Sequence, residues 1–141
     1  MRNSKREHIF IVIPILIVIT ILGILTKFYR GPCENWAHNS FGGVFYEIFW
    51  CLIIYLFYSN LNPAIICLIV FITTCILEFI QLVKYPVLEI IRKNFIGRSL
   101  IGNSFNWFDF PYYIAGILLS YLLLKILRNT IKTKLNKRIA N

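Results

Sequence analysis

Long apolar runs separated by shorter polar stretches are the main pattern along this chain. Four runs are almost free of charged residues, over residues 9–26, 43–58, 64–83 and 109–127. A helix needs about 20 predominantly apolar residues to cross the hydrocarbon core of a bilayer. The pattern therefore predicts an all-α membrane protein with four transmembrane helices, built as a single domain over residues 1–141.

Two of the polar connections carry further structural information. The segment Ser59–Pro63 is so short that it permits only an antiparallel helical hairpin between the second and third spans. The connection before the fourth span is longer, and between residues 86 and 97 it places Leu88, Ile91 and Phe95 on one helical face. This spacing predicts a short amphipathic helix lying at the membrane interface.

Composition agrees with a lipid environment. The chain is 58% hydrophobic and 15% charged, and its mean hydropathy is +0.70. A soluble domain is usually about 45–50% apolar. Three of the four cysteines lie inside apolar runs, and no C-x-x-C pair or Cys/His ligand spacing occurs. We therefore expect neither a metal site nor a disulfide framework, and no cofactor.

The net charge of +9 is concentrated at the two ends of the chain. Nine of the fifteen Lys and Arg residues precede the first span or follow residue 124, and many of them fall in the basic tail over residues 128–141. Basic residues flanking apolar spans favour a cytoplasmic location and contact with anionic headgroups. We expect both termini in the cytoplasm, a location in the bacterial cytoplasmic (inner) membrane, and no nucleic-acid partner.

Polar residues are expected to gather at the end of the bundle opposite the termini. In a four-span topology the second helix begins there, the third ends there, and the fourth begins there. This topology places Glu47, Glu78, Gln81 and Asp109 at similar depth. The adjoining loops add five weaker or supporting candidates, His38, Arg92, Arg98, Asn103 and Asn106. The sequence thus predicts one polar cluster on the loop face.

Two interpretations of this cluster are open. A charged residue inside a span costs about 2.5–3.5 kcal/mol on insertion scales, so Glu78 needs a partner or a cavity. It could pair structurally with Arg98 or Arg92 while Gln81 ties helices together, or the cluster could bind a substrate or lipid headgroup. Glu47 and Asp109 are expected close enough to water to need no partner.

Other polar and small residues fit structural roles. His38 is alone in its loop and is expected to be a surface or capping residue. The glycines at Gly42, Gly43 and Gly116 are expected to permit close approach between helices.

Three segments resemble a family of small bacterial multi-pass membrane proteins that carries a domain-of-unknown-function label. They are Gly42–Trp50, Thr74–Leu82 and Phe105–Tyr113. Members of that family are sometimes named as ribosome-maturation proteins, and nothing in this sequence supports that role.

The chain is more distantly similar to VanZ-like proteins, which are associated with glycopeptide resistance. The resemblance matches Glu78 and Gln81 to a Glu-x-x-Gln motif, Arg98 to a following arginine, and Asp109 to the start of the next helix. Gly116 matches a glycine seven residues after that Asp, and Tyr113 stands where an Asn is usual. The resemblance implies a shared helical scaffold.

Together these features favour the binding or remodelling of a lipid headgroup or cell-envelope precursor at the outer face of the membrane. Arg98, helped by Arg92 or Lys93, would meet a phosphate of an anionic lipid or a lipid-linked precursor. One alternative is an intramembrane enzyme acting on a lipid-linked substrate, with Glu78 or Asp109 as general base or as part of a metal site with His38. Another is a transporter or an accessory subunit of a membrane complex. Beyond the lipid bilayer, the sequence names no partner and no oligomeric state.

Overall fold

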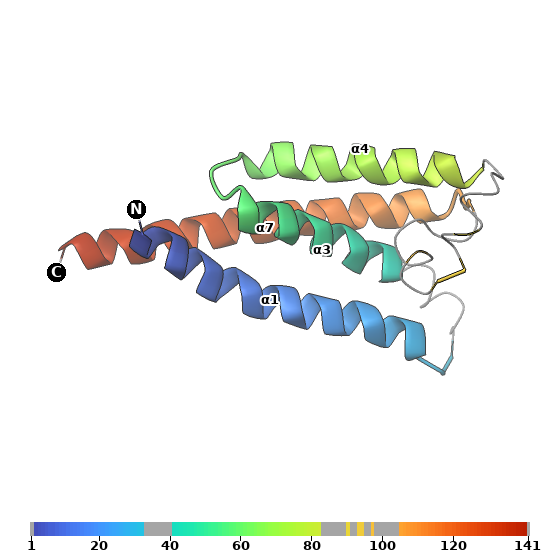
Figure 1. The fold of residues 1–141 in the computed structure, drawn as a ribbon, viewed down its shortest axis with the longest axis horizontal. Coiled ribbons are helices and arrows are strands. Elements are labelled where there is room, and N and C mark those ends of the chain that lie inside the picture. The colour runs from blue at the N-terminus through green and yellow to red at the C-terminus, as the bar shows by residue number, and fades with distance from the viewer. Residues whose placement is uncertain are drawn as a thin grey trace.

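The computed structural model describes residues 2–32, 41–82, 90, 93–94, 97 and 105–140. These residues form four helices that run side by side: α1 (Arg2–Phe28), α3 (Gly42–Phe57), α4 (Pro63–Gln81) and α7 (Asp109–Ala140) (Figure 1). The predicted all-α class is confirmed.

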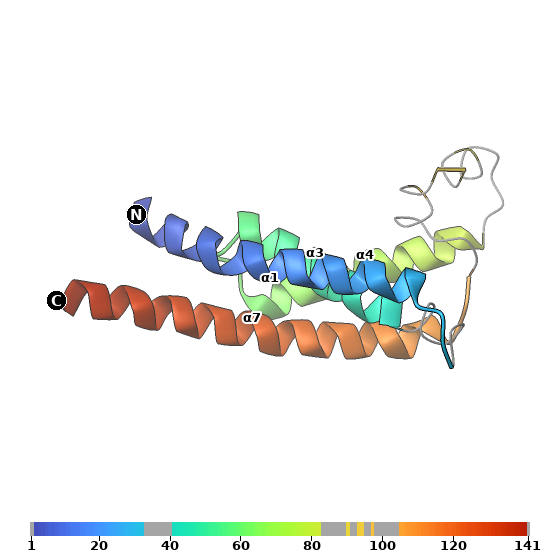
Figure 2. The same cartoon turned by 90° about the horizontal axis from the view of Figure 1, so that it is seen from below.

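The helices alternate in direction, so that the two ends of the bundle differ. Both termini lie at one end, which we call the terminal end (Figures 1 and 2). The last residues of α1 and α4 and the first residues of α3 and α7 lie at the opposite end, which we call the loop end. The predicted grouping of these helix ends is therefore present.

Three of the helices are long and apolar enough to cross a membrane: Glu7–Phe28, Pro63–Gln81 and Asp109–Lys134. The protein is a membrane protein by this criterion. The remaining helix, α3, has 16 residues and is about 24 Å long, which is less than the roughly 30 Å of a typical hydrocarbon core. The second predicted span, over residues 43–58, is thus a shorter apolar helix. The predicted interfacial helix lies mostly outside the described residues.

The short helix α3 is the centre of the bundle. It contacts α1, α4 and α7, and several of its side chains are fully buried, including Cys51, Leu52 and Tyr55. The core around α3 is completed from α1, α4 and α7 by Val12, Ile66, Cys67, Val70, Leu124 and Leu127. Large apolar side chains such as Phe10 and Leu25 on α1 are exposed at the surface of the bundle, as expected for helices whose outer faces meet lipid.

The predicted hairpin joins α3 to α4 at the terminal end. The backbone N–H of Leu61 donates to the carbonyl of Tyr58 in the connecting turn, at 3.1 Å. Asn62 then caps α4 because its side-chain Oδ1 accepts from the N–H of Ala64 at 3.1 Å. Pro63 occupies the first turn of α4, where its missing N–H costs no helical hydrogen bond.

The last helix is longer than the predicted fourth span. It continues to Ala140, so the basic segment after residue 127 is helical. In Figure 1 both α1 and α7 extend beyond the α3–α4 turn at the terminal end.

Glycine permits the closest helix contact. A Cβ at Gly116 on α7 would lie 2.9 Å from the carbonyl oxygen of Val44 and 2.9 Å from the Cβ of Glu47, both on α3. A Cβ at Gly43 on α3 would lie 3.0 Å from a ring carbon of Tyr113. The predicted role of these glycines in close helix approach is confirmed.

Substitution of Gly116 by Ala should destabilise the bundle, because the new methyl group would force the α3 and α7 backbones apart. We expect a loss of about 1–3 kcal/mol in the free energy of unfolding, the usual range for overpacking. Chemical unfolding in detergent measures this loss. Gly23→Ala is the control, since its Cβ would lie 3.4 Å from the Cβ of Phe45. Equal stability of the two variants would contradict the proposed contact.

Candidate functional site

The carboxylate of Glu78 is the centre of a hydrogen-bonded network at the loop end. Glu78 lies in the last turns of α4 and is 1% exposed. Its Oε2 accepts from the Tyr113 hydroxyl at 2.8 Å and from Gln81 Nε2 at 2.9 Å. Its Oε1 accepts from the backbone N–H of Asn106 at 3.1 Å. Three donors therefore satisfy this buried carboxylate and join α4 to α7.

Asn106 extends the network to the start of α7. Its Nδ2 donates to Asp109 Oδ1 at 3.1 Å, and its Oδ1 accepts from the N–H of Phe108 at 3.2 Å. The N–H of Asp109 donates to the Asn106 carbonyl, also at 3.1 Å. Asp109 is half-buried and is the first residue of α7, where the helix dipole favours a negative charge. Asn106 thus links Glu78 to Asp109.

Glu47 occupies a different environment. It is 0% exposed, although the sequence suggested a position near water, so that prediction is wrong. Its side chain lies against Gly116, and no residue in the described part of the chain forms a hydrogen bond to either carboxylate oxygen. The Thr74 side chain on α4 lies nearby without bonding geometry. The glycine contact brings α7 over Glu47 and excludes water from it.

An aromatic cluster adjoins the polar network. The rings of Phe79, Phe105, Trp107 and Phe110 lie with centroids 4.9–6.5 Å apart. Phe110 also contacts the ring of Tyr113 at 6.1 Å. Trp107 is 68% exposed and the neighbouring Phe108 is 78% exposed. The loop end therefore combines hydrogen-bonding groups with exposed aromatic surface.

The structure brings together part of the predicted site. Glu78, Gln81, Asn106 and Asp109 form one network, and Glu47 lies apart from it along α3. Four predicted residues, His38, Arg92, Arg98 and Asn103, lie outside the described residues. The expected pairing of Glu78 with an arginine is therefore untested. Gln81 bonds to Glu78 within its own helix, and the bond across helices comes from Tyr113.

Tyr113 is the main residue that the sequence analysis missed as a site member. Its position one turn into α7, close to the expected depth of Glu78, was the available signal. A tyrosine there supplies the hydroxyl that a buried carboxylate needs.

No metal centre emerges from the described ranges, in which no three His, Cys, Asp or Glu side chains are grouped closely enough to hold an ion. The cysteines described there, Cys51, Cys67 and Cys75, are free thiols within α3 and α4.

Replacement of Tyr113 by Phe should destabilise the protein by removing one donor from the buried Glu78 carboxylate. We expect a loss of about 1–3 kcal/mol in unfolding free energy, measured by chemical unfolding in detergent. Tyr121→Phe, on an exposed part of the same helix, is the control and should change stability by less than about 0.5 kcal/mol. Similar values for both variants would argue against the Tyr113–Glu78 bond.

Replacement of Glu47 by Met should leave the protein at least as stable, because it exchanges an unpartnered buried carboxylate for an apolar group of similar size. A gain of about 1 kcal/mol or more is expected in unfolding free energy. The same substitution at Glu78 is the matched control. It should lower the free energy of unfolding by about 3 kcal/mol, because it leaves three hydrogen-bond donors without their acceptor. Comparable losses at both positions would indicate a stabilising partner for Glu47.

Comparison with known proteins gives one match. A protein-family model described as "Protein of unknown function (DUF2809)" matches residues 33–117, which is more than half of the chain and includes the polar network. No curated protein and no solved structure matches the chain. The chain belongs to the DUF2809 family.

Proposed function

We propose that the protein binds the headgroup of a membrane lipid, or of a lipid-linked cell-envelope precursor, at the loop end of the bundle. One observation carries this proposal. The network of Glu78, Gln81, Asn106 and Asp109 lies where α4 ends and α7 begins, and it is bordered by exposed aromatic rings. These helix ends correspond to the depth at which lipid headgroups lie.

The residues of the network would play different roles. Both Glu78 oxygens already accept hydrogen bonds, so Glu78 supports the site rather than meeting the ligand. Asp109 and Gln81 are partly exposed, and in the described part of the chain no hydrogen bond occupies Asp109 Oδ2 or Gln81 Oε1. These oxygens would accept hydrogen bonds from hydroxyl, amide or amino groups of a headgroup.

The aromatic cluster would hold the same ligand at the interface. Trp and Tyr are favoured at the headgroup level because they have an apolar body and a polar edge. The exposed faces of Trp107 and Phe108 would contact the apolar surface of a sugar ring or the upper part of an acyl chain. Polar and apolar parts of one ligand would then be bound side by side.

A phosphate would complete the ligand. We retain Arg98, which follows the network's α4 residues in sequence, as the residue that would meet the phosphate, because its planar fork matches two phosphate oxygens. This role would parallel the arginine of VanZ-like proteins, and their similarity to this chain is part of the proposal. The excess of basic residues in the terminal segments favours a cytoplasmic terminal end in a bacterial inner membrane, which would put the site at the outer leaflet.

The enzymatic alternative is less well supported. A general base must be able to reach the proton that it takes from the substrate, whereas Glu78 is 1% exposed and already accepts three hydrogen bonds. Asp109, which uses Oδ1 for Asn106, is the better candidate for a base in that alternative.

Titration of the detergent-solubilised protein with a polyprenyl-phosphate-linked sugar and with phosphatidylglycerol, followed by native mass spectrometry, tests the proposal. Asp109→Asn and Arg98→Ala should each weaken binding of at least one of these lipids by about tenfold or more, the effect of losing one charged contact. Thr133→Val is the control, because Thr133 lies on the same helix near the terminal end and its hydroxyl donates to the Asn129 carbonyl within that helix.

Unaltered binding by both site variants, in protein that melts at the wild-type temperature, would remove the proposal. A loss confined to Arg98→Ala would leave a phosphate contact without the Asp109 contact and would contradict the role of the network.

A further inference from the structure

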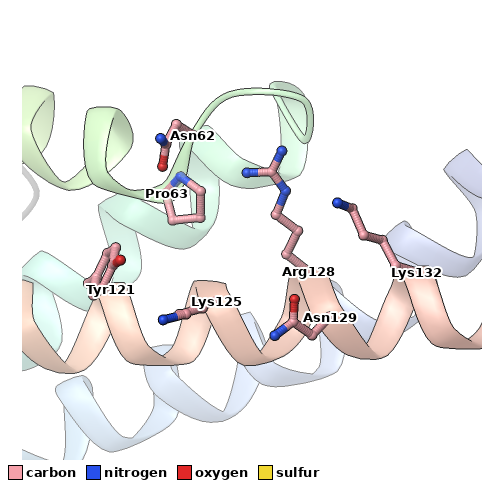
Figure 3. A pocket seen from close by; sticks show the side chains of 7 residues that line it. All are labelled: Asn62, Pro63, Tyr121, Lys125, Arg128, Asn129 and Lys132. Atoms are coloured by element: carbon pink, nitrogen blue, oxygen red, sulfur yellow. The ribbon is translucent and has the colours of Figure 1, made fainter.

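A second polar site lies at the terminal end, away from the network described above. A pocket of about 380 Å³ opens between the start of α4 and the middle turns of α7. Its lining includes Asn62, Pro63 and Tyr121 together with three basic residues of α7, namely Lys125, Arg128 and Lys132 (Figure 3).

The three basic residues share one face of α7. Their spacings of three and four residues place consecutive side chains on successive turns. In Figure 3 the Arg128 and Lys132 side chains extend from α7 towards the turn that carries Asn62. The ammonium group of Lys125 lies 5.9 Å from the ring centroid of Tyr121. The pocket therefore gathers three positive charges beside hydrogen-bonding groups.

These charges have no acidic partner in the described part of the chain. No carboxylate in the described ranges forms an ion pair with Lys125, Arg128 or Lys132, and the pocket lining contains no acid. Like charges three or four residues apart on a helix destabilise it by a few tenths of a kcal/mol per pair. An external anion would offset this repulsion.

The position of the pocket along the axis of α7 indicates the source of that anion. Helix α4 begins at Pro63 and has 19 residues. On α7, Arg128 lies 19 residues after Asp109, which corresponds to a rise of about 28 Å along the helix axis. This distance is close to the thickness of the hydrocarbon core, about 30 Å. Arg128 is half-buried and Lys132 is exposed, and at this rise along α7 both side chains would lie near the level of the lipid phosphates.

We propose that this pocket binds the phosphate of an anionic phospholipid in the leaflet at the terminal end. Arg128 would bind two phosphate oxygens through its fork, and Lys132 and Lys125 would supply further charge. The Asn62 amide nitrogen, which the helix-capping bond leaves unused, is a donor for the same headgroup. Basic pockets beside membrane spans bind acidic headgroups in this way. The inference does not rest on the proposed function at the loop end.

Lipid titration of the full chain in detergent, followed by native mass spectrometry, tests this site. The double variant R128Q/K132Q should bind phosphatidylglycerol about tenfold or more weakly than the wild type, because two charged contacts are lost. Binding of phosphatidylcholine with the same acyl chains should stay unchanged. The matched control K134Q/K137Q removes the same charge from exposed lysines of α7 that do not line the pocket, and it should bind phosphatidylglycerol within about twofold of the wild type.

Three outcomes would overturn the proposal. Equal losses of phosphatidylglycerol affinity in the two double variants would show that general surface charge, and not this pocket, binds the lipid. Unchanged phosphatidylglycerol binding by R128Q/K132Q would remove the site. Displacement of the lipid by millimolar inorganic phosphate, together with stabilisation of the wild type and not of R128Q/K132Q, would assign the pocket to a soluble phosphate compound. Melting curves of each variant establish that it is folded.

Discussion

The hydrogen bonding of one buried carboxylate organises the loop end of this bundle. Burying a carboxylate is costly unless its oxygens accept hydrogen bonds, and the buried Glu78 meets this condition through donors from three places in the chain. Because Tyr113 and Asn106 both reach Glu78, the register of α4 against the start of α7 is fixed. Asp109 and the aromatic cluster take their depth from that register.

The contact between α3 and α7 at Gly116 rests on close packing, whereas the contact between α4 and α7 rests on hydrogen bonds. At Gly116 the two helices meet almost backbone to backbone, which allows close van der Waals packing in a setting where lipid removes most of the hydrophobic drive for association. The same contact seals Glu47 away from water. Replacing a buried carboxylate of this kind by an apolar side chain is often neutral or stabilising, so we expect Glu47 to lower the stability of the bundle.

Helix positions followed from the sequence, and side-chain partners did not. The predicted bounds of α3 and α4 lie within one or two residues of those observed, because apolar runs end where the chain must meet water. The apolar run that predicts α3 is also the shortest of the four, but its apolar composition alone does not separate a full span from a shorter apolar helix. Hydropathy also does not predict the burial of Glu47, because that burial depends on Gly116, about seventy residues further along the chain.

The pocket beside the basic residues of α7 could not be predicted from the sequence either. The charge of the basic segment is evident from the sequence and predicts the orientation of the chain. The pocket that brings Arg128 beside Asn62 depends instead on how the α3–α4 turn packs against α7. Such contacts join residues far apart in sequence and follow from the tertiary arrangement.

The continuity of α7 has a mechanical consequence. One unbroken helix carries Asp109 at the loop end and Arg128 at the terminal end, with no proline or glycine between them other than Pro111 in the first turn and Gly116 at the α3 contact. A helix of this kind moves as a rod, so a shift along its axis displaces both ends by the same amount. The loop end and the terminal end of the bundle are thereby joined by a single rigid element.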